Sequence, residues 1–287
     1  MGVPFRHVFQ QGPVIAAIAR GAIAAARGPA THSAPTTPGP WIEEKLPPRP
    51  DDLIRDYVRH VGGDPSSYRN EVPPHLFPQW VFPLQARALE GIPYPMQKVL
   101  NGGCRLKVVA PLPTREALVV RTRLEGIDDD GRRAVIHLVA LTGTRSDAEL
   151  LRADLFAIVP LAKKKGDGTK KKEPARVPKR AQEIQRWKLG ADAGLDFAKL
   201  TGDFNPVHWV KPYARAFGFR SCILHGFSTF ARSWEGLRAR MLRPSLLDVR
   251  FTKPLVLPAR VGLHITPEQQ VFVGEAGGPA YLEGTYA

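Results

Sequence analysis

Cysteine is nearly absent from this chain of 287 residues, which contains only Cys104 and Cys222. Two isolated cysteines fit neither a disulfide-rich secreted domain nor the paired spacing of a zinc site. We expect both to be buried thiols of a cytoplasmic protein in a reducing compartment. Long apolar runs are also missing, because residues 14–26 are short and are interrupted by Arg20. We therefore expect no transmembrane segment.

Acidic residues are scarce, with 27 Asp and Glu against 41 Lys and Arg and a net charge of +14. The excess lies mainly in residues 1–42, with three arginines and no acid, and in residues 163–180, with nine basic residues and two acids. These two segments carry +10 of the +14. The rest of the chain is only mildly basic and has no zinc-finger or RNP-like motif, so we expect no nucleic-acid partner.

The two basic segments mark the expected domain boundaries. Residues 1–45 combine small and turn-forming residues without a core pattern, which predicts a basic, poorly ordered N-terminal arm. A transit peptide, an interfacial amphipathic helix and a disordered arm all fit its composition. We expect deletion of residues 1–40 to leave activity largely intact. Residues 161–180 have dense like charge and almost no large apolar side chain, which predicts a Lys-rich, solvated linker.

Residues 46–160 and 181–287 repeat one pattern of helix, Gly-Asp turn, helix and strands. In the first repeat, the pattern predicts a helix from Asp51 to His60 and a second one starting at Pro83. Strand-like runs follow at residues 105–109, 117–124, 133–141 and 150–159. The dipeptide Pro-Leu recurs 143 residues apart, at 111–112 and 254–255. A repeat of this length indicates a duplicated domain of the α+β class.

One loop of the second repeat gathers polar residues suited to catalysis. The string TGDFNPVH, residues 201–208, places Asp203, Asn205 and His208 within six residues. Pro206 keeps Asn205 out of helical geometry, so the segment is a loop, although TGDFNP alone would also fit an ordinary turn. The string ILHGF, residues 223–227, then opens a longer helix. Its apolar stripe consists of Phe227, Phe230, Ala231, Trp234, Leu237 and Met241.

In this order and at this distance, TGDFNPVH and ILHGF resemble the signature of the MaoC-like dehydratases, the (R)-specific enoyl-CoA hydratase family. The resemblance implies a double hotdog, in which two tandem domains each wrap an antiparallel sheet around a central helix. It also implies reversible hydration of trans-2-enoyl thioesters to (3R)-hydroxyacyl thioesters in fatty acid metabolism. The substrate would be an acyl-CoA or acyl-carrier-protein thioester, without cofactor or metal. The protein would be a monomeric double hotdog or a homodimer.

The same resemblance, together with the chemistry of the side chains, suggests roles for four residues. Asp203 and His208 would hold water and transfer protons. Asn205 would orient the water or this pair. The backbone N–H of Gly226, at a helix start, would stabilise negative charge on the thioester oxygen. His225 is expected to be a structural residue of the helix start.

The first repeat lacks part of this set. Asp64 aligns with Asp203, but Ser66 aligns with Asn205 and Arg69 with His208. A proton-transfer pair without its imidazole cannot act, so we expect a degenerate N-terminal hotdog domain and one active site, in the C-terminal domain.

Two other functions remain open. A hotdog thioesterase would need an acid on the central helix, and Glu235 is the only one between Gly226 and Met241. A non-catalytic acyl-binding or dehydratase partner subunit is the other possibility. The intact set of Asp203, Asn205 and His208 argues against it.

Overall fold

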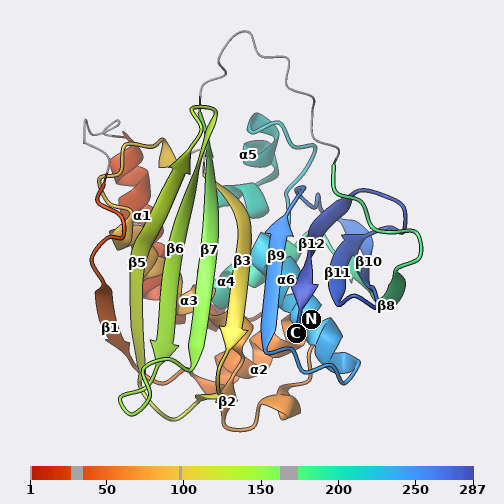
Figure 1. Cartoon of the computed structure of the whole chain (residues 1–287), viewed down its shortest axis with the longest axis horizontal. Coiled ribbons are helices and arrows are strands. Elements are labelled where there is room, and N and C mark those ends of the chain that lie inside the picture. The colour runs from red at the N-terminus through yellow and green to blue at the C-terminus, as the bar shows by residue number, and fades with distance from the viewer. Residues whose placement is uncertain (1, 27–34, 97–98, 162–173) are drawn as a thin grey trace.

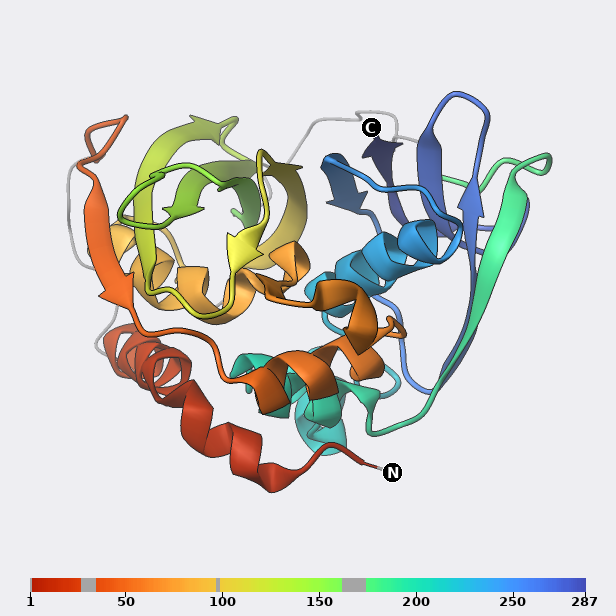
Figure 2. The same ribbon diagram turned by 90° about the horizontal axis from the view of Figure 1, so that it is seen from below.

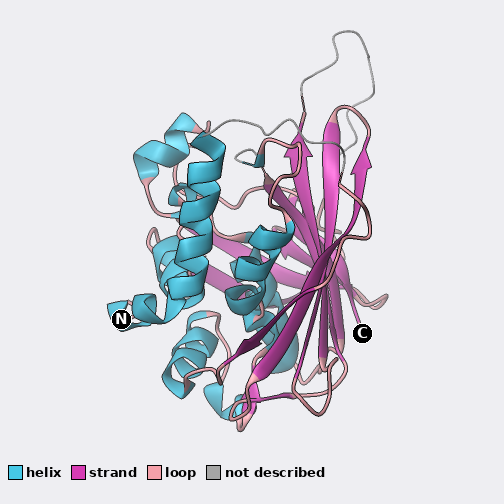
Figure 3. Ribbon diagram, turned by 90° about the vertical axis from the view of Figure 1, so that its left-hand side faces the viewer, coloured by secondary structure: helices cyan, strands magenta, loops and turns pink. Residues whose placement is uncertain are grey.

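Ten antiparallel strands form one continuous sheet, with the helices gathered on one side of it (Figure 3). The computed structural model describes residues 2–26, 35–96, 99–161 and 174–287. The order across the sheet is β1-β5-β6-β7-β3-β9-β12-β11-β10-β8. The strands of the N-terminal half are β1 (Ile42–Leu46), β3 (Leu100–Val108), β5 (Leu118–Asp129), β6 (Arg133–Gly143) and β7 (Leu151–Pro160). Those of the C-terminal half are β8 (Gln182–Leu189), β9 (Leu246–Phe251), β10 (Ala259–Ile265), β11 (Gln270–Gly274) and β12 (Ala280–Tyr286). A separate ribbon pairs β2 (Glu71–Val72) with β4 (Leu112–Pro113).

The two halves of the sheet are equivalent in topology. Counted inward from its edge, each half places its strands in the order first, third, fourth, fifth and second along the chain. The second strands, β3 and β9, therefore meet at the centre (Figure 1). At this joint Arg105 pairs with Asp248 in register, and Arg105 Nη2 lies 2.6 Å from Asp248 Oδ2. The duplication expected from the repeat is therefore confirmed, as is the α+β double-hotdog architecture.

Each half of the sheet curves around a central helix, as Figure 2 shows. These central helices are α3 (Pro78–Ala88) and α6 (Gly226–Ala239). Where they meet, the rings of Phe77 and Phe227 pack edge to face with centroids 5.6 Å apart. The remaining α-helices are α1 (Gly12–Ala26), α2 (Asp51–His60), α4 (Ala193–Thr201) and α5 (Lys211–Ala216). Short 3-10 helices are η1 (Phe5–Gln11), η2 (Pro65–Tyr68), η3 (Pro74–Leu76) and η5 (Pro206–His208).

The N-terminal segment differs from the poorly ordered arm that its composition suggests. Residues 5–26 form η1 and α1, and His7, Gln11 and Val14 are almost fully buried. Their partners lie on α2, α3 and α4, up to nearly 200 residues away, so no local pattern could reveal them. Residues 27–34 of the arm and 162–173 of the expected linker lie outside the described residues.

Two helix limits also differ from expectation. α3 begins at Pro78, and Pro83 lies inside it. Proline suits the first position of a helix, and Pro78 occupies that position. Pro83 lies inside the helix, where its missing N–H costs one N–H···O=C bond. α6 ends at Ala239, so Met241 follows with φ 63° and is 79% exposed instead of extending the apolar stripe. Within the described ranges, no helix combines the length and apolarity needed to cross a bilayer.

Candidate active site

The polar loop of the C-terminal half begins where α4 ends. Gly202 takes the left-handed conformation, with φ 82°, and its N–H donates to the carbonyl of Ala198. This conformation favours glycine and stops the helix sharply. Asp203 follows at once, and its side chain is 28% exposed. The carboxylate is therefore held at a helix exit with access to solvent.

The loop then turns through η5 and presents His208. Asn205 caps this turn, because its Oδ1 accepts the N–H of Val207 at 3.2 Å. His208 Nδ1 lies 2.8 Å from the carbonyl oxygen of Ile223. A carbonyl can only accept, so Nδ1 carries the proton and Nε2 keeps a lone pair. An imidazole held in this tautomer is suited to act as a general base.

His225, directly before α6, stacks on His208. The ring centroids are 3.6 Å apart and the planes differ by 25°. His225 Nε2 donates to the carbonyl of Asp203 at 2.9 Å, which connects the start of α6 to the loop of residues 203–208. Its Nδ1 is buried and has no hydrogen-bond partner in the described part of the chain. His225 thus contacts both predicted residues, since it bonds the backbone of Asp203 and stacks on the ring of His208.

Burial keeps both imidazoles neutral. Burial and the neighbouring His208 lower the pKa of His225 to about 3. Burial also lowers the pKa of His208 below its usual value, although the charge of Asp203 and the bond to the Ile223 carbonyl oppose this shift. Neutral rings can stack closely without charge repulsion. His208 is therefore available as a base at neutral pH.

Asp203, His208 and His225 offer donor atoms that all lie within 4.8 Å of one another, as in a metal site. The stacking argues against that use. Imidazole lone pairs lie in the ring planes, and these two planes are nearly parallel and about one ring thickness apart. Two such lone pairs do not converge on one ion at about 2.0–2.1 Å. The arrangement favours proton transfer.

Gly226 begins α6 next to His225. The N–H groups in the first turn of a helix have no intrahelical acceptor, and the helix dipole adds positive potential there. A side-chain carbon on Gly226 would lie only 3.1 Å from the ring of Phe251, so the packing at this position is close and favours glycine. The helix start can therefore receive a developing negative charge beside the two imidazoles.

The structure brings Asp203 and His208 together on one loop and sets Gly226 beside them through His225. Asn205 is exposed and its side-chain oxygen caps η5, so it shapes the loop. His225 was expected to be only structural, and it lies within the cluster. The string ILHGF was the signal for it, because His225 precedes the glycine that starts α6.

The equivalent loop of the N-terminal half is bonded differently. Asp64 accepts the N–H and the hydroxyl of Ser66 at 2.9 and 2.6 Å, and so caps η2. His75 precedes α3 as His225 precedes α6, but its Nε2 lies 2.7 Å from Oε1 of Glu235. Tyr68 donates to the same oxygen at 2.5 Å. The imidazole of this half is thus buried and bonded to the central helix of the other half, whereas Asp64 caps an exposed turn.

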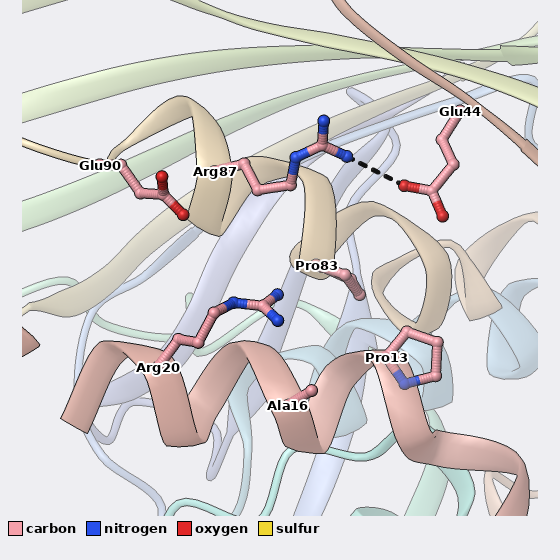
Figure 4. A pocket seen from close by; sticks show the side chains of 7 residues that line it. All are labelled: Pro13, Ala16, Arg20, Glu44, Pro83, Arg87 and Glu90. Atoms are coloured by element: carbon pink, nitrogen blue, oxygen red, sulfur yellow. Dashed lines mark hydrogen bonds and ion pairs between the residues drawn. The ribbon is translucent and has the colours of Figure 1, made fainter. Parts of the chain in front are cut away.

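A pocket of about 470 Å³ lies elsewhere, between α1, α3 and β1 (Figure 4). Its lining consists of Pro13, Ala16, Arg20, Glu44, Pro83, Arg87 and Glu90. Arg87 and Glu44 are paired across it, with Nη1 and Oε2 3.1 Å apart. None of these residues belongs to the loop 203–208, so the pocket is distinct from the cluster.

A family model described as "MaoC like domain" matches residues 170–273. Among curated proteins, 3-hydroxyacyl-thioester dehydratase X of Mycobacterium tuberculosis is 26% identical over 200 residues, which are 69% of this chain and 71% of that protein. The probable enoyl-CoA hydratase 2 of Dictyostelium discoideum is 24% identical, over 62% of this chain and 64% of that protein. Other relatives are named as peroxisomal enzymes.

The fold of this chain is also similar to that of solved structures. The crystal structure of HtdX of Mycobacterium tuberculosis superimposes with a TM-score of 0.70 and 20% identity, covering 86% of this chain and 99% of that one. The match extends over both halves of the sheet, whereas the family model covers chiefly the half that carries Asp203 and His208.

Proposed function

We propose that this chain, whose residues 170–273 match the MaoC-like domain, hydrates trans-2-enoyl thioesters to (3R)-hydroxyacyl thioesters, or catalyses the reverse dehydration, in fatty acid metabolism. The observation that carries the proposal is a neutral His208, with its Nε2 lone pair available, on the same loop as the partly exposed Asp203. The reactions named for two relatives, a dehydratase and a hydratase, support the same class of chemistry.

In hydration, water attacks C3 of the enoyl group and a proton is added to C2. Asp203 and His208 would hold this water and take a proton from it as the new C–O bond forms. The same pair would then deliver a proton to C2, so the reaction neither consumes nor releases protons. Dehydration follows the same steps in reverse. His208 acts through Nε2, because Nδ1 is occupied by the Ile223 carbonyl.

The negative charge that develops on the thioester oxygen needs a donor. The first turn of α6, beginning at Gly226, would supply backbone N–H groups and the positive end of a helix dipole. Loss of one such donor typically raises the barrier by about 3 kcal/mol. Asn205 contributes indirectly, since its cap on η5 holds His208 in place.

We place one active site in each chain, in the domain of residues 181–287. The domain of residues 46–160 would complete the sheet and shape the space for the acyl group. Asp64 is engaged by Ser66, and His75 is engaged by Glu235, so neither resembles the proton-transfer groups of the other half. Pairing of β3 with β9 supplies within one chain the contact that two separate hotdog subunits would make.

The position of Glu235 argues against the thioesterase alternative. Its side chain is 3% exposed, and Oε1 accepts bonds from both Tyr68 and His75. A carboxylate in this state has no approach to a thioester carbon. The partner-subunit alternative is disfavoured because the cluster of Asp203, His208 and His225 is assembled. A cytoplasmic location stays a prediction.

An absorbance assay with crotonyl-CoA and longer trans-2-enoyl-CoA substrates tests the proposal. We expect loss of the enoyl absorbance without release of free thiol, and a (3R) product. Free thiol would indicate a thioesterase. No change with either CoA or carrier-protein thioesters, across chain lengths, would indicate a non-catalytic protein. The same series also determines the preferred acyl length and carrier.

A further inference from the structure

The N-terminal segment reaches the end of α4 directly. Gln11, which is fully buried, donates from Nε2 to the carbonyl oxygen of Leu200 at 3.0 Å. The last carbonyls of a helix have no intrahelical donor and need one from outside. Two neighbouring carbonyls of α4 are satisfied within the helix region, Phe197 by the Thr201 hydroxyl and Ala198 by Gly202 N–H. Gln11 supplies a donor for the carbonyl of Leu200, two residues before Gly202.

The same amide also bonds to the N-terminal domain. Gln11 Oε1 accepts from Gln79 Nε2 on α3 at 3.1 Å. Gln79 Oε1 in turn accepts from Arg49 Nη1 at 3.0 Å. The direction of every bond in this series is determined, because Arg49 can only donate and the Leu200 carbonyl can only accept. A chain of aligned hydrogen bonds, partly buried at Arg49 and buried from Gln79 onward, therefore runs from one domain to the helix that precedes Asp203.

Packing joins the same two elements. A side-chain carbon on Gly202 would lie 2.6 Å from Cβ of Val14 and 3.1 Å from Cβ of Gln11. Gly202 thus serves both its left-handed conformation and the close approach of α1. The segment is anchored further by Val3, whose N–H bonds to Asp196 and whose carbonyl accepts from Lys199.

From these contacts we propose that Gln11 is a positioning residue for the proposed catalytic loop (residues 203–208), and that Gln11 and Val14 together hold the end of α4 from which this loop begins. Gln11 holds the C-terminal turn of α4 against α3, and Val14 blocks displacement of Gly202. These two contacts then determine the direction in which the chain leaves α4 at Asp203. This inference rests on the proposed function for its kinetic test. It also reverses the expectation that residues 1–40 are dispensable.

The test compares Gln11→Met with Arg6→Met. The first variant keeps side-chain length and burial but loses both amide bonds. Arg6 lies on the same segment, and its ion pairs with Asp52 and Asp56 on α2 do not involve the catalytic loop. We expect kcat of Gln11→Met to fall about tenfold with KM changed less than about twofold, since only the geometry of transition-state contacts changes. Arg6→Met should retain wild-type kcat.

Hydrogen exchange of the backbone of residues 200–208 provides a readout independent of activity. We expect faster exchange in Gln11→Met and wild-type exchange in Arg6→Met, with unchanged exchange in the strands of both variants. Wild-type kcat or wild-type loop exchange in folded Gln11→Met would overturn the inference. An equal effect of Arg6→Met would do so as well, because it would indicate loosening of the whole segment. A wild-type protein without hydratase activity but with the expected exchange pattern would refute the proposed function alone.

Discussion

At the scale of single residues, the central feature is a pair of stacked, neutral imidazoles with a carboxylate beside them. His208 and His225 each use one ring nitrogen to bond a backbone carbonyl, of Ile223 and of Asp203. These bonds set both tautomers and orient both rings. His208 has the more open position, since Asp203 beside it is partly exposed while His225 is 2% exposed. We therefore assign the proposed proton-transfer role to His208 and a supporting role to His225.

Replacement of His208 by alanine should lower kcat by about 100-fold or more, the usual scale for a general acid–base group. The hydrogen bond to Ile223 is also lost, so folding must be checked by circular dichroism and thermal unfolding. Steady-state kinetics with an enoyl-CoA substrate gives the measurement. Activity near that of the wild type in a folded variant would exclude His208 from proton transfer.

The pH dependence of activity follows from the lowered pKa of His208. The imidazole must be neutral to accept a proton, and burial lowers its pKa from 6.5. The acidic limb of kcat/KM should therefore lie below pH 6.5. Asp203→Asn removes the charge that opposes this shift, so the limb of its residual activity should move to still lower pH. A limb above pH 6.5 in the wild type would contradict the neutral, buried base.

At the scale of elements, α6 connects the two domains through Glu235. Burial acts to raise the pKa of this carboxyl, but the bond and charge of His75 and the bond from Tyr68 lower it below its usual value overall. The guanidinium of Arg238 also lies over the ring of Tyr68, 4.3 Å from its centroid. A charged glutamate inside the protein is tolerated only because its oxygens are bonded. The cluster joins the helix that starts at the active site to the opposite domain.

Loss of this carboxylate should destabilise the protein. Glu235→Ala leaves His75 and Tyr68 buried without their partner, and we expect the free energy of unfolding to fall by about 3–5 kcal/mol. Because the folded pKa is lowered, this stabilisation is fully present above pH 4.5 and is lost as the pH falls through the lower folded value. Urea unfolding of both proteins at neutral and acidic pH measures the loss of stability and its dependence on pH.

The matched control is Glu283→Ala. Glu283 faces exposed Arg250 at 3.8 Å on the sheet, and this partly solvated pair should contribute about 1 kcal/mol or less. A similar effect of the two substitutions would contradict the role assigned to the buried cluster. Catalysis offers a second check, since a folded Glu235→Gln variant should retain activity if the enzyme is not a thioesterase.

At the scale of the whole molecule, the strength of local patterns decided what could be predicted from sequence. The loop 201–208 is contiguous, so the spacing of Asp203 and His208 was informative, and the long repeat revealed the duplication. α2 has the predicted limits because acids at its start and apolar residues at helical spacing agree. Gln11 and Leu200 are 189 residues apart, and no local pattern records such a contact. The same reason hid the pairing of His75 with Glu235.

The duplication also explains how one sheet can hold two unlike loops. Both halves keep a helix, a turn containing an aspartate, and a central helix preceded by a histidine. In the C-terminal half the histidine and the aspartate lie together, with His225 Nε2 3.8 Å from Oδ2 of the partly exposed Asp203. In the N-terminal half the aspartate caps a turn and the histidine is bonded to Glu235. The account therefore predicts catalytic asymmetry between equivalent positions.

The most direct measurement of that asymmetry is the kcat for trans-2-enoyl-CoA hydration by Asp203→Asn and by Asp64→Asn, both as folded full-length proteins. The account predicts a loss of about 100-fold or more for Asp203→Asn and of less than about fivefold for Asp64→Asn. The two substitutions are matched in chemistry, and each residue follows the same kind of turn in its own domain. Equal losses, or near wild-type activity of Asp203→Asn, would contradict a single active site in the C-terminal domain.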